Sequence, residues 1–252
     1  MTDSDIKTLS KVPAVTIGFW IIKILATTLG ETGGDAVSMS MGLGYLTGTA
    51  IFSVIFLGAV LIQIKAKKFH PVIYWATIIA TTTVGTTLAD FADRSLGIGY
   101  LGGSLLLAGF LLGSLFVWHR SMGTISVSSI NSAKAEIFYW VTIMFSQTLG
   151  TALGDWTADT AGLGYVGAAG IFGTMLAVLV ALYFSTNISR VFLFWSAFIL
   201  TRPLGAVVGD FLDKPVSDGG LELSRYSASL VLIGAIILLA FVFKQKPAEQ
   251  AH

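Results

Sequence analysis

The sequence predicts an all-α, polytopic membrane protein whose eight transmembrane helices form four two-helix repeats. Three observations support this fold class. The 252-residue chain is 54% hydrophobic and only 12% charged, and its mean hydropathy is +0.81. Charge-poor segments of about 20 residues, long enough to cross the hydrocarbon of a bilayer, alternate with basic clusters. One short motif that ends in aspartate occurs four times.

The charge-poor segments are the expected transmembrane helices. In chain order they cover residues 13–34, 43–64, 71–91, 98–118, 135–157, 162–184, 191–211 and 226–243. They pair into two-helix hairpins, which form repeats at 13–66, 68–120, 133–185 and 188–244. Apart from a Ser-rich linker between the halves, nothing suggests a second domain, so residues 1–252 are expected to form a single transmembrane domain.

The basic residues predict the orientation of the helices. Most Lys and Arg residues fall at one set of helix ends, and only Arg94, Lys214 and Arg225 fall at the other. Most acidic residues gather at that second set of ends. Because cytoplasmic loops carry the excess of Lys and Arg, both termini are expected to be cytoplasmic.

Composition excludes several functions. The chain has no cysteine, so disulfides and thiolate metal sites are excluded, and its three histidines fall in predicted cytoplasmic loops or the tail. The basic residues are dispersed in loops, which argues against nucleic acid as a partner. The expected partners are the lipid bilayer and a small cation, with no cofactor, and a homo-oligomer is compatible with the sequence.

The repeated motif places one aspartate at the end of each odd-numbered helix. Its copies are LGETGGD at 29–35, VGTTLAD at 84–90, LGTALGD at 149–155 and LGAVVGD at 204–210. A tryptophan stands fifteen residues before each aspartate, at Trp20, Trp75, Trp140 and Trp195. After three of the aspartates, a Gly-x-Gly-Tyr turn leads into the even helix. The tryptophans at one boundary and the tyrosines at the other are expected to form aromatic belts at the membrane interfaces.

Successive copies point the same way, because each unit contains two spans, so the repeats are expected to be parallel. Four tandem units with two spans, a tryptophan and this motif resemble a bacterial multi-pass membrane family built from a repeat of unknown function. The resemblance covers roughly residues 15–243. It implies a multi-pass protein of the bacterial inner membrane, and it implies little about activity.

Polar residues recur every four positions before each aspartate and so share one face of each odd helix. The stripes are Thr27–Glu31–Asp35, Thr82–Thr86–Asp90, Gln147–Thr151–Asp155 and Arg202–Ala206–Asp210. Beside each stripe lies a pair of small residues four apart, a spacing that lets helices pack closely in lipid. We therefore expect the odd helices to form an inner layer with stripes turned toward a common axis, and the even helices to form an outer layer.

The stripes predict a polar path for a hard cation. The expected pathway residues are Thr27, Thr82, Thr86, Gln147 and Thr151 together with the acids. The expected metal ligands are Glu31, Asp35, Asp90, Asp155 and Asp210, because carboxylate oxygens suit Mg²⁺ or Mn²⁺. The competing interpretation is that each aspartate caps the turn that follows it by accepting backbone N–H bonds.

Two basic residues, Lys23 and Arg202, lie inside spans and are expected to balance the acidic charges. Glu31 and Arg202 are expected to lie close together, either as a static ion pair or as partners that exchange during transport. At the outer mouth, Arg94 and Lys214 adjoin a second set of acids, Asp93 and Asp213. Local surface pairing is expected there.

These features favour a cation transporter, with proton coupling and the direction of transport left open. A carrier is preferred to a channel because Arg202 would obstruct an open cation pore. An enzyme is not expected, since the motifs lack the Tyr-Asp and Gly-x-Gly-Asp pair of intramembrane aspartyl proteases, and serine chemistry lacks an embedded histidine. The alternative is a structural or regulatory membrane protein whose motifs serve only packing.

Overall fold

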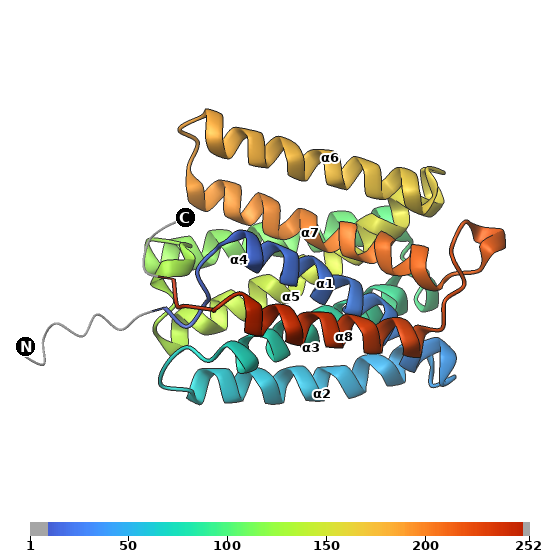
Figure 1. The fold of residues 1–252 in the computed structure, drawn as a ribbon, viewed down its shortest axis with the longest axis horizontal. Coiled ribbons are helices and arrows are strands. Elements are labelled where there is room, and N and C mark those ends of the chain that lie inside the picture. The colour runs from blue at the N-terminus through green and yellow to red at the C-terminus, as the bar shows by residue number, and fades with distance from the viewer. Residues whose placement is uncertain (1–9, 249–252) are drawn as a thin grey trace, which may run out of the picture.

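The computed structural model describes residues 10–248, which fold into a bundle of long helices (Figure 1). The predicted domain extends beyond these residues at both ends, so the expected cytoplasmic termini themselves lie outside the described part. The eight long helices are α1 (Ile17–Asp35), α2 (Gly44–Lys65), α3 (Pro71–Asp90), α4 (Tyr100–Met122), α5 (Ala133–Asp155), α6 (Gly164–Ser185), α7 (Arg190–Asp213) and α8 (Arg225–Val242). Each of the eight predicted segments coincides with one of these helices.

Local chemistry explains where the inner helices begin. The side chains of Thr16, Ser132 and Ser189 accept hydrogen bonds from the backbone N–H three residues ahead, which caps α1, α5 and α7. Helix α3 starts instead with Pro71, which is preorganised for the first helical turn. The Gly-x-Gly turns before α2, α4 and α6 contain two glycines with positive φ each, a conformation that other residues rarely adopt.

A π-helical turn follows the motif aspartate in the first three repeats, where only a short turn was predicted. These turns are η1 (Ala36–Ser40), η2 (Phe91–Ser95) and η4 (Trp156–Thr160). The fourth repeat differs because α7 continues to Asp213 without one. Two short 3₁₀ turns, η3 (Val127–Ser129) and η5 (Val216–Asp218), complete the described secondary structure.

The helices form two layers, as the sequence predicted, but with a different pairing. The inner helices α1, α3, α5 and α7 pack into a closed ring in that order, with α7 against α1. Each outer helix packs on the inner helix of the following repeat: α2 on α3, α4 on α5, α6 on α7 and α8 on α1. The prediction that the two helices of one repeat pack against each other is therefore wrong. Each repeat reaches over its neighbour, and α8 closes the ring.

Six of the helices are long and apolar enough to cross a membrane, namely α2, α3, α4, α6, α7 and α8. The outer helices bury few residues within the protein; α2, for example, buries only Gly48, Phe56 and Gln63. Helices α1 and α5 contain 19 and 23 residues and are more polar, but they lie in the inner ring. This apolar exterior is consistent with a membrane protein.

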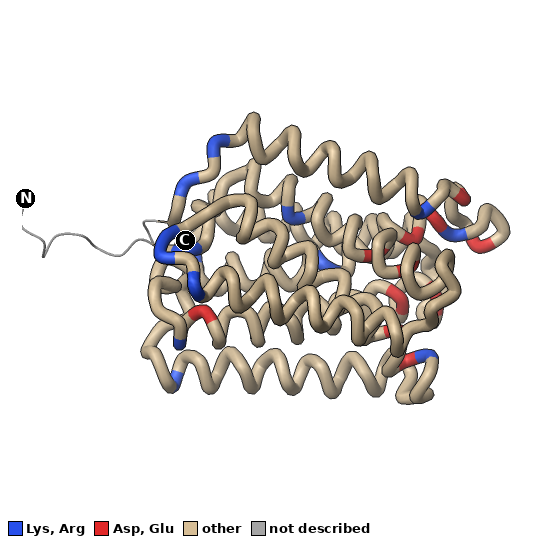
Figure 2. The backbone as a smooth tube through the Cα atoms, turned by 90° about the horizontal axis from the view of Figure 1, so that it is seen from below, with Lys and Arg blue, Asp and Glu red and all other residues tan. Residues whose placement is uncertain are grey.

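Charged residues gather mainly at the two ends of the bundle (Figure 2). One end carries mostly Lys and Arg, and the other carries most of the Asp and Glu together with a few basic residues. At the basic end, the two terminal segments pair through Ala14 N–H to Lys246 O (2.7 Å) and Ala248 N–H to Val12 O (2.9 Å). Nearby, Lys11 Nζ lies 2.6 Å from the buried Glu136 carboxylate. The paired terminal segments thus cover part of the basic end.

An aromatic layer fills the interior of the bundle next to the basic end. Trp75, Trp140 and Trp195 are 2–4% exposed and pack against other rings, and Tyr74 and Tyr139 share a hydrogen bond of 2.7 Å between their hydroxyls. The expectation of an interfacial tryptophan belt is therefore wrong for these three residues. They stand on the inner helices, where neighbouring helices cover them before lipid can.

Candidate functional site

The four motif aspartates gather at the acidic end of the inner ring, and all four are buried. Asp35, Asp90, Asp155 and Asp210 are 1–3% exposed. They end or nearly end the four inner helices, so the ring packing brings them to one level. Burying four carboxylates requires countercharges, since an unpaired buried charge costs several kcal/mol.

Two basic side chains each bridge two of these aspartates. Arg94 lies 2.8 Å from Asp90 and 3.4 Å from Asp155. Lys214 contacts Asp35 and lies 3.1 Å from Asp210. Each cation therefore joins the aspartate of its own repeat to that of the next repeat around the ring. A shift of 120 residues converts one bridge into the other, as expected for two duplicated halves.

The expected local pairing of Arg94 with Asp93 and of Lys214 with Asp213 is wrong. Adjacent residues point to different faces of a helix, whereas residues four apart share one, so each cation reaches Asp90 or Asp210 instead. Arg225 takes the role expected of Lys214, because its Nε lies 3.1 Å from Asp213. Both carboxylate oxygens of Asp93 lack a hydrogen-bond partner among the described residues.

The competing interpretation, in which each aspartate caps the turn that follows it, is not supported by the described residues. Asp35, Asp90 and Asp155 each precede a π-helical turn, and none of their side chains makes a capping hydrogen bond to it. Their contacts run across the ring to side chains of other repeats or to a residue four positions on. The motif aspartates therefore converge, and they do not serve only the turns that follow them.

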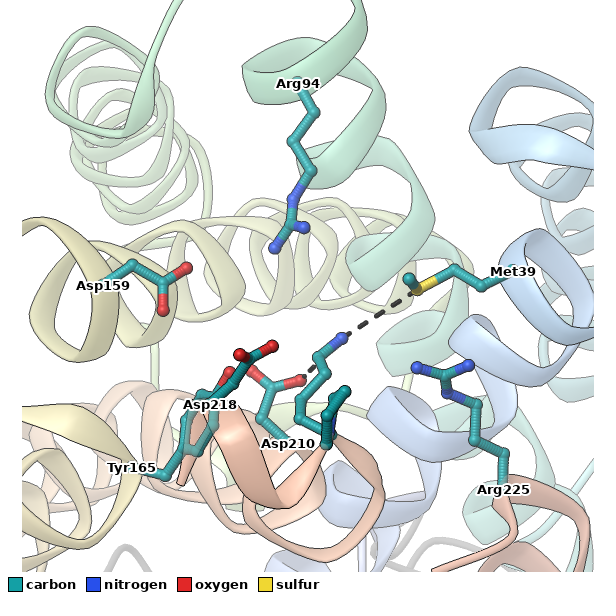
Figure 3. A pocket seen from close by; sticks show the side chains of 9 residues that line it. Met39, Arg94, Asp159, Tyr165, Asp210, Asp218 and Arg225 are labelled. Atoms are coloured by element: carbon teal, nitrogen blue, oxygen red, sulfur yellow. Dashed lines mark hydrogen bonds and ion pairs between the residues drawn. The ribbon is translucent and has the colours of Figure 1, made fainter. Parts of the chain in front are cut away.

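A cavity of about 390 Å³ opens above this layer. Arg94, Asp159, Asp210, Lys214 and Arg225 are among the side chains that line it. Figure 3 shows Arg94, Asp159 and Arg225 pointing inward from three different directions around Asp210. The cavity thus leaves room for water next to the buried Asp210 carboxylate, and both acidic and basic side chains line it.

Lys214 holds its charge firmly in this setting. Burial alone lowers the pKa of its ammonium group, but the carboxylates of Asp210, Asp35 and Asp213 outweigh burial and keep the pKa above its usual value. A protonated Lys214 therefore acts as a tethered cation between Asp35 and Asp210.

Glu31 and Arg202 form the buried ion pair that the sequence suggested. Arg202 Nη2 lies 2.8 Å from Glu31 Oε2, and both side chains are almost fully buried. The same nitrogen donates to Thr86 Oγ1 at 2.6 Å and contacts the Thr151 hydroxyl. One guanidinium therefore ties together all four inner helices and fills the ring axis at this level.

Three of the predicted ligands form a cluster. Carboxylate oxygens of Glu31, Asp35 and Asp210 all lie within 4.8 Å of one another, and the three residues are buried. Asp90 and Asp155 lie apart from this cluster, on the opposite pair of inner helices, and share Arg94. The structure thus divides the five predicted ligands into a group of three and a group of two.

The remaining stripe residues pack against glycines of neighbouring inner helices. The missing side chain of each glycine leaves a notch that the stripe residue fills. A side chain at Gly30 would collide with Thr82, one at Gly150 with Arg202 and one at Gly205 with Thr27. A Cβ at Gly85 would lie 3.0 Å from Gln147, which is a tight contact. The Thr27 hydroxyl, for example, donates toward the backbone carbonyl oxygens of Lys23 and Ile24 on its own helix and of Thr201 on α7, at 2.8–3.2 Å. These polar groups line contacts between inner helices and leave no open stripe in the described structure.

Sequence reasoning missed the bridging roles of Arg94 and Lys214. A signal was present, since each stands four residues after a motif aspartate, a spacing typical of helical ion pairs. Their second contacts, to the aspartates of the next repeat, had no such signal because they depend on ring closure.

The family model described as Repeat of Unknown Function (DUF347) matches the chain four times in tandem, at residues 18–69, 73–124, 138–189 and 193–246. These matches cover most of the chain, and each corresponds to one inner helix with its following outer helix. The chain therefore belongs to this repeat family and carries four copies of the repeat. No curated protein and no solved structure matches it.

Proposed function

We propose that this protein carries a small hard cation, such as Mn²⁺ or Mg²⁺, across the membrane and binds it at Glu31, Asp35 and Asp210. The observation that carries this proposal is the convergence of their carboxylate oxygens within 4.8 Å, beside a cavity that opens at the acidic end. Buried carboxylate oxygens at this spacing are the ligands that hard divalent cations prefer.

The tethered Lys214 ammonium supports a carrier mechanism. It contacts Asp35 and Asp210, two of the three proposed ligands, and so stands where an arriving cation would interact. A cation that enters from the cavity replaces this ammonium, and Lys214 returns when the cation leaves. The empty site then never holds three uncompensated buried charges.

Arg202 supports a carrier over a channel. It fills the ring axis below the cluster and contacts residues of the other three inner helices. Passage of a cation therefore requires Glu31 to exchange Arg202 for the cation, a step that needs rearrangement of the inner ring.

We further infer that all eight helices cross the bacterial inner membrane as four parallel repeats with cytoplasmic termini. The charge asymmetry of Figure 2 supports this orientation. Helices α1 and α5 are polar for spans, yet their neighbours shield them from lipid. Intramembrane polar residues of this kind commonly mark transport pathways.

A direct test is flux of radioactive Mn²⁺ into liposomes that contain the purified protein. Asp35→Asn and Glu31→Gln each remove one ligand charge without changing side-chain size, so we expect at least a tenfold loss of flux and of Mn²⁺ affinity. The matched control is Glu222→Gln, which removes an exposed carboxylate outside the cluster and should leave both unchanged.

One observation favours a second candidate, a non-transporting structural membrane protein. All four motif aspartates are already engaged by Arg94 or Lys214, as a purely architectural ring would require. In that case the wild-type protein moves no Mn²⁺ or Mg²⁺, and Asp35→Asn lowers stability without changing ion binding. This result would reject the transport proposal.

A further inference from the structure

The middle of the inner ring holds a group of buried polar atoms that the proposed cation site does not use. Lys23 Nζ, the Thr82 hydroxyl, both amide atoms of Gln147, and Arg202 Nε and Nη1 all lack a hydrogen-bond partner among the described residues. The four side chains come from α1, α3, α5 and α7, and each residue is 0% exposed. Unpaired buried polar atoms are rare, and a cluster of them needs an explanation.

These atoms lie in adjacent levels of the repeat, which places them around one stretch of the axis. Thr82, Gln147 and Arg202 occupy equivalent positions, eight residues before their motif aspartates. Lys23 stands one helical turn farther toward the basic end, close enough to Arg202 for two positive charges to repel each other. Its equivalents in the other repeats are Ile78, Ile143 and Phe198, so its ammonium group points into an otherwise apolar level, 4.2 Å from the centre of the Phe198 ring.

Charge counting shows an imbalance in this region. Between the aromatic layer and the aspartates, the inner helices carry two basic side chains, Lys23 and Arg202, and one acid, Glu31. Glu31 is already paired with Arg202. The ammonium form of Lys23 therefore has no carboxylate partner among the described residues. The Phe198 ring offsets such a charge only in part, because a cation–π contact does not replace the hydration that a buried ion loses.

The unpartnered atoms also differ in hydrogen-bonding type. Lys23 Nζ, Arg202 Nε, Arg202 Nη1 and Gln147 Nε2 are donors, and only the Gln147 oxygen is an acceptor that cannot donate. Such an excess of donors matches a ligand that accepts hydrogen bonds and carries negative charge.

From this arrangement we infer that a small monovalent inorganic anion binds in the inner ring between Lys23, Gln147 and Arg202. The anion balances the Lys23 charge and accepts from the unpartnered N–H groups. This site is distinct from the Glu31–Asp35–Asp210 cluster and lies on the opposite side of Arg202 from it along the helices. It does not depend on transport of a cation.

The experiment measures equilibrium binding of radioactive chloride to the purified detergent-solubilised protein in a gluconate buffer. We expect saturable binding of about one chloride per chain, with competition by bromide and none by sulfate. Lys23→Ile introduces the residue that repeats two and three carry at this position and should lower chloride affinity at least tenfold. Lys23→Arg should retain binding, and Lys67→Ile, which removes an exposed basic residue, is the matched control.

Thermal stability provides a second readout that does not depend on radioactive binding. A ligand that binds only the folded state raises the melting temperature, so exchange of gluconate for chloride should raise it for the wild type and Lys67→Ile but not for Lys23→Ile. Absence of saturable chloride binding, or equal binding by Lys23→Ile, overturns the inference and leaves water or a neutral amine in this region. Loss of Mn²⁺ flux alone would reject only the proposed function.

Discussion

At the residue scale, the Glu31–Arg202 pair shows how one departure from the repeat is matched by another. Threonine occupies the position of Glu31 in repeats two and three, and that of Arg202 in repeats one and two. The acid and the base thus occur once each and meet at 2.8 Å in the ring. The position of each was visible in the sequence, but their contact depends on α7 packing against α1.

Arg202→Thr should destabilise the protein by about 3–5 kcal/mol, because it leaves Glu31 charged and buried without its partner. Adding Glu31→Thr removes that charge, so the double variant should recover most of the loss. Equilibrium unfolding in detergent gives the free energy of unfolding of Arg202→Thr, of Glu31→Thr and of the double variant. These three values give the coupling energy between the two sites. A double variant whose loss equals the sum of the single losses would show that the two side chains do not interact.

At the element scale, the glycines beside the stripes determine how closely the inner helices approach. The small-residue spacing predicted close packing, and the structure shows the partner of each notch to be the stripe of the neighbouring repeat. Helix packing in lipid relies on such close fits, since hydrocarbon offers no hydrophobic drive for association.

Gly205→Ala should destabilise the protein by about 1–3 kcal/mol through overpacking, because the added methyl group would lie 2.9 Å from the backbone carbonyl carbon of Thr27. Gly33→Ala is the control, since a methyl group there meets nothing within 4 Å. Thermal unfolding of both variants in the same detergent tests the difference. Equal melting temperatures would mean that α7 and α1 adjust freely at this contact.

At the scale of the whole molecule, the repeats close into a ring whose first and last segments meet. Ala14 and Lys246 are hydrogen-bonded, and α8 occupies on α1 the position that α2 occupies on α3. The junction between the fourth and the first repeat is therefore formed by the same kind of helix contact as the other three junctions.

A circular permutant tests this closure. Joining the natural ends with a flexible linker and opening the chain between Asn187 and Ile188, in an exposed loop, should give a folded protein with a melting temperature within a few degrees of wild type. Opening the chain beside the buried Val127 is the comparison and should cost more. If both permutants fail to insert or fold, the order of synthesis is essential to the ring.

Sequence reasoning alone predicted the eight helices, the four repeats, the inner and outer layers and the clustering of acids at one end. Those features depend on hydropathy, charge and helical spacing, which are local properties of the chain. The structure was needed to show that each outer helix covers the next repeat, that Arg94 and Lys214 bridge pairs of aspartates, and that Lys23 has no hydrogen-bond partner among the described residues. These contacts join residues far apart in sequence, so they follow from the closure of the ring.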